Sequence, residues 1–178
     1  MKRYRNNKGF SYVEMIVVLG IMSIMTAFIA LTLGTVNRNN VRRASESIQS
    51  KMNEARVSAM SKGTHRGYLM IARYNNNIYT YVGEGFNTTT GALYTAEEIS
   101  KRGDKLCSSK LKITVAGQEM NGDVNNVVYL QFKQSTGGLN ACSGTISGNQ
   151  ITVKVANDKD TMVSSFKIFT QSGKIKNE

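Results

Sequence analysis

Hydrophobic and polar positions follow three different patterns along this chain. Residues 10–36 form an apolar run in which 19 of the 27 side chains are apolar and Glu14 is the only charge. In residues 37–62, small and apolar side chains recur at spacings of four, four, three and four, which is the period of one helical face. That stripe consists of Ala44, Ile48, Met52, Ala55 and Ala59. Because Gly63 favours a helix end, one long helix is predicted over 10–62.

Residues 63–178 have the pattern of a β-rich domain. Short runs of β-branched and aromatic residues are separated by Asn, Gly and Ser, and the run 151–156 has Ile or Val at every second position. Hairpin turns are predicted at 75–77 and 147–149, and a short helix with a threonine cap at 94–100. The expected strands are 67–73, 77–82, 111–116, 127–133, 151–156 and 165–170. The fold class is therefore α+β, a long N-terminal helix packed on a C-terminal antiparallel sheet.

Charge gives the apolar run a direction. The chain carries 23 basic and 12 acidic residues, and the nine residues before the run contain four bases and no acid: Lys2, Arg3, Arg5 and Lys8. As a helix, the run of 10–36 spans roughly 40 Å, against about 30 Å of hydrocarbon in a bilayer. By the positive-inside rule, the leader 1–9 stays in the cytoplasm and the domain 63–178 lies outside. A single-pass membrane protein is expected, with 37–62 as the amphipathic continuation of the span.

The apolar run is compatible with three kinds of segment: a cleaved secretory signal, a plain anchor and a specialised anchor. A secretory signal has a shorter apolar core that ends in a small-x-small site, and none closes this run. A plain anchor has no use for Glu14, which costs on the order of 2.5–3.5 kcal/mol inside a membrane helix. A carboxylate close enough to the interface to reach water is the remaining alternative for this residue.

The segment from Lys8 to Ile21 resembles the N-terminus of type IV pilins and pseudopilins. In that family a basic leader ends in Gly, an aromatic residue follows, and a Glu stands at the fifth mature position before the apolar helix. Gly9, Phe10 and Glu14 match this spacing. The resemblance implies cleavage between Gly9 and Phe10 by a prepilin peptidase, N-methylation of Phe10, and assembly through Glu14. The chain departs from the family in having no Pro.

The second half resembles, more weakly, the GspH/FimT branch of minor pilins and pseudopilins. The similarity lies in Glu54-Ala55-Arg56 near the helix end and in Gly137-Gly138 and Gly173-Lys174-Ile175 towards the C-terminus. It implies a structural subunit of a type IV pilus or type II secretion-like filament. Its partners would be other pilins or pseudopilins, the prepilin peptidase, and membrane lipid before assembly.

A second functional hypothesis is a DNA-binding minor pilin of an uptake system. Lys167, Lys174 and Lys176 flank an expected β-turn, and basic C-terminal tails bind DNA in some members of the branch. Binding by three or four cations would be strongly salt dependent. Against it, Asp158, Asp160 and Glu178 dilute the positive charge, and no aromatic residue is interleaved for stacking.

Candidates for catalysis are few. His65 is the only histidine and has no companion ligands for a metal. Ser164 and Lys167 have the Ser-x-x-Lys spacing of serine acyl-enzymes but lie in an expected strand without the other motifs. The segment 83–85, Gly-Glu-Gly, lacks the third glycine of a dinucleotide site. We therefore expect no enzymatic activity, no cofactor and no metal.

Cys107 and Cys142 are the only cysteines, and both belong to the part expected outside the membrane. Oxidation is possible there, so a disulfide between them is predicted. Such a bridge would close a loop of about 35 residues and stabilise the domain by roughly 3–4 kcal/mol.

Overall fold

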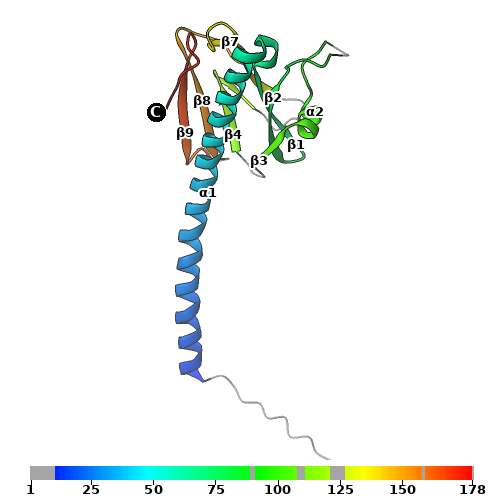
Figure 1. Ribbon diagram of the computed structural model, residues 1–178. Coiled ribbons are helices and arrows are strands. Elements are labelled where there is room, and N and C mark those ends of the chain that lie inside the picture. The colour runs from blue at the N-terminus through cyan, green and yellow to red at the C-terminus, as the bar shows by residue number, and fades with distance from the viewer. Residues whose placement is uncertain (1–10, 89–90, 108–110, 121–126, 158, 178) are drawn as a thin grey trace, which may run out of the picture. The chain divides into compact units, whose positions relative to one another are not determined.

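The computed structural model describes residues 11–88, 91–107, 111–120, 127–157 and 159–177, apart from the side chains of 30–37. The chain divides into two compact units, Met1–Asn37 and Arg38–Glu178, and helix α1 (Tyr12–Lys62) runs through both. After α1, the elements (Figure 1) are η1 (Thr64–Arg66), β1 (Tyr68–Tyr74), β2 (Asn77–Gly83), α2 (Ala96–Arg102), β3 (Asp104–Cys107), β4 (Leu111–Val115), β5 (Gln118–Glu119), β6 (Val127–Phe132), β7 (Leu139–Cys142), β8 (Gln150–Asn157), β9 (Val163–Phe169) and β10 (Ile175–Asn177).

The first unit contributes the amino half of α1. Its candidate membrane span, Tyr12–Ile29, has a mean hydropathy of 2.1, and none of its residues is buried. The hydroxyls of Ser23 and Thr26 donate to the carbonyls of Leu19 and Met22, at 2.8 and 2.9 Å. Ser23 and Thr26 are the only Ser or Thr residues between Tyr12 and Ile29. Both hydroxyl groups thus make their hydrogen bonds within the helix, as an apolar surrounding requires.

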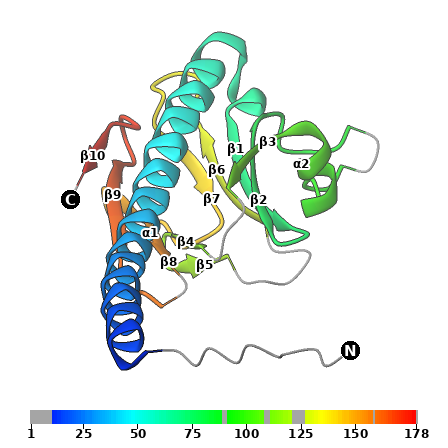
Figure 2. The same cartoon turned by 90° about the horizontal axis from the view of Figure 1, so that it is seen from below.

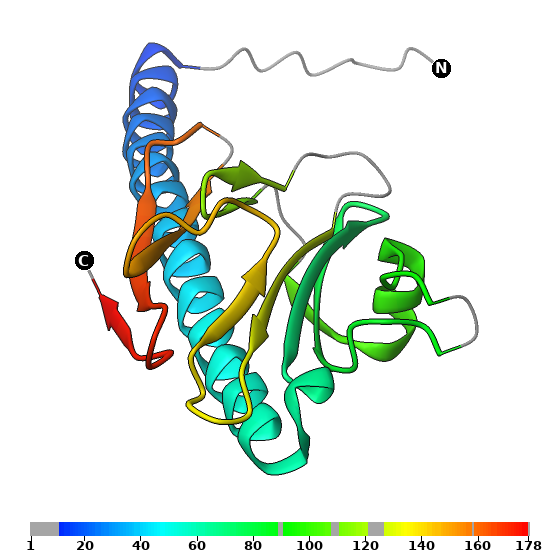
Figure 3. The ribbon, with the colours of Figure 1, turned by 90° about the horizontal axis from the view of Figure 1, so that it is seen from above.

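The second unit consists of two antiparallel five-stranded sheets beside the carboxyl half of α1. The first sheet has the strand order β3-β2-β1-β6-β7 and the second has the order β10-β9-β8-β4-β5. Figures 2 and 3 show β9 and β10 on one side of this part of α1 and β1, β2 and α2 on the other. The residues of α2 pack on the face of the first sheet opposite to the face that packs on α1. The α+β class is therefore confirmed, but the expectation of a single sheet is wrong.

The main core lies where α1 meets both sheets. All five residues of the stripe expected on α1 are buried, and Val41 extends that stripe by one turn. The first sheet contributes Leu69, Ile71 and Phe132, and the second contributes Val153 and Phe166. The helical stripe and the alternating strands bury the faces that their periods predict.

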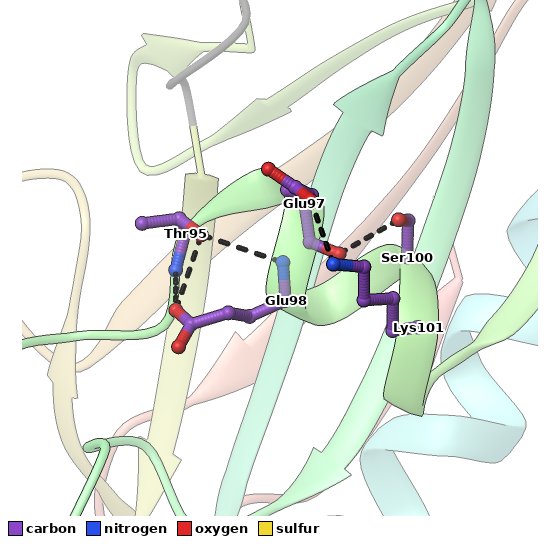
Figure 4. Close-up of polar contacts among 5 residues, drawn as sticks. All are labelled: Thr95, Glu97, Glu98, Ser100 and Lys101. Carbon is purple, nitrogen blue, oxygen red and sulfur yellow. Dashed lines mark hydrogen bonds and ion pairs between the residues drawn. The ribbon is translucent and has the colours of Figure 1, made fainter. Parts of the chain in front are cut away.

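Local sequence signals account for the turns and the short helix. Asn75 and Asn76 adopt left-handed backbone angles, φ 46° and 61°, and join β1 to β2 in a tight hairpin. Thr95 caps α2 in a capping box: Glu98 N donates to Thr95 Oγ1 at 3.3 Å, and Thr95 N donates to Glu98 Oε2 at 2.9 Å (Figure 4). The turn expected at 147–149 is present at Gly148, but β7 and β8 belong to different sheets, so it is not a hairpin.

The two sheets are joined where the β6–β7 and β9–β10 turns meet. Leu139 N donates to the carbonyl of Thr170 at 2.7 Å. A Cβ on Gly138 would lie 2.3 Å from the carbonyl oxygen of Gln171, so only glycine permits this approach. The side chain of Arg56 from α1 also reaches this junction, because its Nε would lie 2.7 Å from a Cβ on Gly137.

Candidate functional site

The amino end of α1 holds the first candidate site. Gly9 and Phe10, the expected cleavage and methylation residues, lie outside the described residues. Glu14 lies in the first turn of α1, where the helix dipole stabilises a carboxylate, and its side chain is exposed. Among the described residues, no cation forms an ion pair with it. The arrangement is one carboxylate among the unburied, otherwise uncharged side chains of Tyr12–Ile29.

The three lysines of the nucleic-acid hypothesis lie on the last two strands of the second sheet. Lys167 on β9 is directly opposite Lys176 on β10, so both side chains project from the same face. Phe166 and Ile168 of β9 point to the other face and are buried. Lys174 is in the β9–β10 turn, where its carbonyl accepts a hydrogen bond from Phe169 N at 3.0 Å. The structure therefore pairs Lys167 with Lys176 and places Lys174 at the end of the hairpin.

Two further lysines share this outer face, which sequence inspection did not predict. Lys154 on β8 is opposite Ser165, and Lys112 on β4 is opposite Ala156, so the register places both on the face of Lys167. Acidic groups reduce the charge of this face, since Lys112 Nζ lies 2.9 Å from Asp160 Oδ2. Alternation within 151–156 indicated that Lys154 points outward, but only strand order brings it close to β9.

A hollow of about 650 Å³ lies beside the β9–β10 hairpin. Lys174 and Lys176 line it together with Asn149 and Phe169. It combines two cations, an amide and an aromatic ring on one surface, a set of groups that can bind an anionic ligand with a flat, stackable part.

The predicted disulfide between Cys107 and Cys142 is wrong. Both residues are free of a disulfide; they end strands β3 and β7, which are the opposite edges of the first sheet. At about 4.8 Å per strand, the four intervals between these edges amount to roughly 19 Å, whereas a disulfide needs Cα atoms within about 7 Å. Cys142 Sγ instead donates to the carbonyl of Gly144 at 3.3 Å. Burial raises the pKa of the Cys142 thiol above its ordinary value.

The catalytic motifs considered in the sequence are not assembled into a site. Ser164 Oγ donates to Ser45 Oγ of α1 at 3.0 Å, and Lys167, three residues along the same strand, projects from the opposite face. His65 lies in the short helix η1, and the described residues hold no group of three His, Cys, Asp or Glu side chains that could bind a metal.

A polar groove of about 600 Å³ at the end of β2 was not predicted from the sequence. Arg66 and Glu84 form an ion pair of 3.1 Å along its wall. The rings of Tyr81 and Tyr94 meet edge to face at 5.7 Å, and burial raises the pKa of the Tyr81 hydroxyl. Arg102 lies over Tyr94, with its Cζ 4.9 Å from the ring centre. Arg66 and Glu84 of this groove therefore neutralise each other, and Arg102 lies against an aromatic ring.

Comparisons of the chain with protein-family models, with curated proteins and with solved structures find no match.

Proposed function

We propose that this chain is a minor pilin or pseudopilin, a structural subunit of a type IV pilus or a type II secretion-like filament. A prepilin peptidase removes residues 1–9, and the mature chain joins other pilins through the amino half of α1. Before assembly it is a single-pass protein of the cytoplasmic membrane, with the domain 63–178 outside in a pilin-like arrangement. Its role is to assemble and to bind partners, and it is not an enzyme.

One observation carries this proposal: Glu14 is the only charge in the segment Tyr12–Ile29 of α1, and none of the residues of that segment is buried. Contiguous apolar surface on this scale is covered by lipid or by other chains. A carboxylate in that surface is costly in either setting unless a cation is nearby. The α-amino group that cleavage after Gly9 creates on Phe10 of an adjacent subunit is such a cation.

The pairing of Glu14 with a neighbour's amine also accounts for the spacing of the motif. Four residues separate Phe10 from Glu14, which is about 6 Å along a helix. Two parallel helices that pair these groups are displaced axially by roughly one turn, so the charge pair can define the stagger between subunits. The free energy that Glu14 costs in lipid favours its transfer into an assembly that supplies the partner.

The contrast between the two halves of α1 further supports this function. From Val41 to Ala59, one face of the helix is buried against the two sheets of the second unit, whereas none of the residues of Tyr12–Ile29 is buried by the described part of the chain. A single helix thus combines a docked half, which carries the β-rich domain, with a half available for helix–helix packing.

Co-expression with a prepilin peptidase tests the proposal. The expected product lacks nine residues and carries a methylated Phe10 amine, both measurable by intact-mass and peptide mass spectrometry. Gly9→Leu should block cleavage because the peptidase must accommodate the residue before the cut. Gly20→Ala is the matched control, since a Cβ there meets nothing within 4 Å. Retention of the full leader after co-expression with an active peptidase would refute the proposal.

The outer face of the second sheet, which carries Lys154, Lys167 and Lys176, favours a second candidate function. This function is a filament-borne DNA-binding subunit of an uptake system. The observation is the cross-strand pair Lys167–Lys176 with Lys154 on the same face. Three phosphate contacts predict a slope of about −3 when the logarithm of the association constant is plotted against the logarithm of the salt concentration. Lys167→Gln with Lys176→Gln should reduce this slope by about two, and Lys133→Gln, on the β6–β7 turn, should leave it unchanged. Equal effects of both changes would indicate non-specific attraction by net charge.

A further inference from the structure

Three arginines surround the first turns of α1 within the second unit. Arg38, Arg42 and Arg43 are all exposed, and Val41 between them is buried to 3% exposure. Arg42 Nε donates to Glu46 at 2.8 Å, whereas no ion pair of Arg38 or Arg43 is found among the described residues. Because Val41 is packed in the core, this turn of α1 is fixed against the sheets of the second unit. The three arginines therefore project from it into solvent.

The loop between β8 and β9 lies beside these arginines. A hollow of about 530 Å³ is lined jointly by Arg38 and Arg42 of α1, by Met162 of the loop and by Val163, the first residue of β9. Val163 is 55% exposed even though it begins a strand. The surface therefore combines guanidinium groups with one uncovered apolar side chain, Val163, beside the half-buried Met162. We name it the collar, which consists of Arg38, Arg42, Arg43, Lys159, Met162 and Val163.

The collar has an excess of positive charge. Among the described residues of α1, β4 and the β8–β9 loop near it, five cations face two carboxylates. Both carboxylates are already engaged, Glu46 by Arg42 and Asp160 by Lys112. The cations are Arg38, Arg42, Arg43, Lys112 and Lys159.

Chain connectivity places the collar near a membrane surface, however the two units are arranged. Arg38 follows Val36, the last residue of the apolar run, by two residues. Two residues of backbone extend at most about 7.6 Å. If the run spans a bilayer, as the proposed function requires, Arg38 must lie at or near the headgroups where the chain leaves the hydrocarbon.

We propose that the collar binds anionic phospholipid headgroups, so that the second unit rests on the membrane surface before the chain enters a filament. Arginine suits this contact because its guanidinium group donates two parallel hydrogen bonds to a phosphate. The exposed side chain of Val163 can enter the interfacial region at the same time, as in other amphipathic membrane contacts. Each additional cation near an anionic leaflet favours the docked state by about fivefold. This inference rests on the membrane anchoring in the proposed function.

A single-tryptophan reporter can measure docking in the full chain, because the chain has no tryptophan of its own. Val163→Trp places the reporter in the collar. Ser135→Trp places it beside the far end of α1, where Gln134 N donates to Thr64 Oγ1 at 3.0 Å. From Arg38 to the end of α1 is about 36 Å of helix. Both variants are reconstituted in bilayer discs of phosphatidylcholine, with or without phosphatidylglycerol, that carry brominated quencher lipids.

The expected result is quenching of the tryptophan at 163 in discs with phosphatidylglycerol, little quenching without it, and little at 135 in either. About 1 M salt should abolish the difference. Arg38→Gln with Arg43→Gln should lower the ratio of docked to undocked chains about 25-fold. Lys133→Gln is the matched charge control, because it lies in the turn beside the far end of α1, and it should leave the ratio unchanged.

Two results would overturn the inference in distinguishable ways. If the chain stays in the bilayer through an alkaline carbonate wash but quenching at 163 does not depend on phosphatidylglycerol or on the arginines, the collar is not a lipid contact and the proposed function stands. If the wash releases the chain, the membrane anchoring fails and the inference fails with it. Binding of duplex DNA that is lost in the arginine variant but not in Lys167→Gln would assign the collar to nucleic acid instead, which also overturns it.

Discussion

Replacement of Ile48 by alanine tests whether α1 and the two sheets form one core. Ile48 is fully buried in the middle of the helical stripe, among side chains of both sheets. Truncation removes three carbon atoms from a packed site and should lower the free energy of unfolding of the second unit by about 2–5 kcal/mol. For a unit of this size, about 3 °C of melting temperature corresponds to 1 kcal/mol. The expected decrease in melting temperature is therefore roughly 6–15 °C.

Near-ultraviolet circular dichroism of the full chain in detergent suits this measurement, because six of the eight tyrosines lie in the second unit. The far-ultraviolet signal from the amino half of α1 should persist through the transition. Val57→Ala is the matched control: Val57 is on the same helix but 64% exposed, and its truncation should change stability by no more than about 0.5 kcal/mol. Equal melting temperatures for Ile48→Ala and Val57→Ala would refute the packing of α1 on the sheets.

Three further results are expected. Glu14→Ala should leave membrane insertion intact or improved but reduce incorporation into filaments, measured by membrane fractionation and by filament shearing; normal incorporation would remove the assembly role of this carboxylate. Gly138→Ala should destabilise the second unit by about 1–3 kcal/mol, because its Cβ would lie 2.3 Å from the carbonyl oxygen of Gln171, and an unchanged melting temperature would contradict that close approach. The raised pKa of Cys142 should slow its alkylation near pH 8.5 relative to the unfolded chain, since the thiolate is the reactive form. Because its folded pKa exceeds the unfolded value, the free energy of unfolding should also fall as pH rises above about 8.5, and equal alkylation rates for the folded and unfolded chain would refute the burial of this thiol.

Sequence alone predicted the elements whose signal is local and periodic. The stripe from Ala44 to Ala59 is buried as its spacing indicated, and α1 ends at Lys62 before a glycine. The six expected strands all occur, within two residues of their expected ends. The capping threonine correctly predicted the short helix α2, which begins at Ala96. Helical and strand periods are properties of neighbouring residues, so they can be recognised without knowledge of the fold.

Short edge strands escaped prediction because their residues have no distinctive alternation. β3 and β7 have four residues each, β10 has three and β5 has two. Such segments become strands only because a longer neighbour offers its unpaired backbone groups. The division of the strands into two sheets depends in turn on which neighbour each strand finds, and that is decided by packing against α1.

The motif of the first candidate site is contained in the sequence, because Gly9, Phe10 and Glu14 are separated by fixed numbers of residues. The other surfaces were decided by the tertiary structure. The sequence predicted a disulfide between Cys107 and Cys142, but the strand order places these residues at opposite edges of one sheet. Lys176 became the neighbour of Lys167 through the register of β9 and β10. The physical reason is that side-chain periodicity specifies which face a residue occupies, whereas proximity between distant segments depends on strand order, register and loop packing across the whole core.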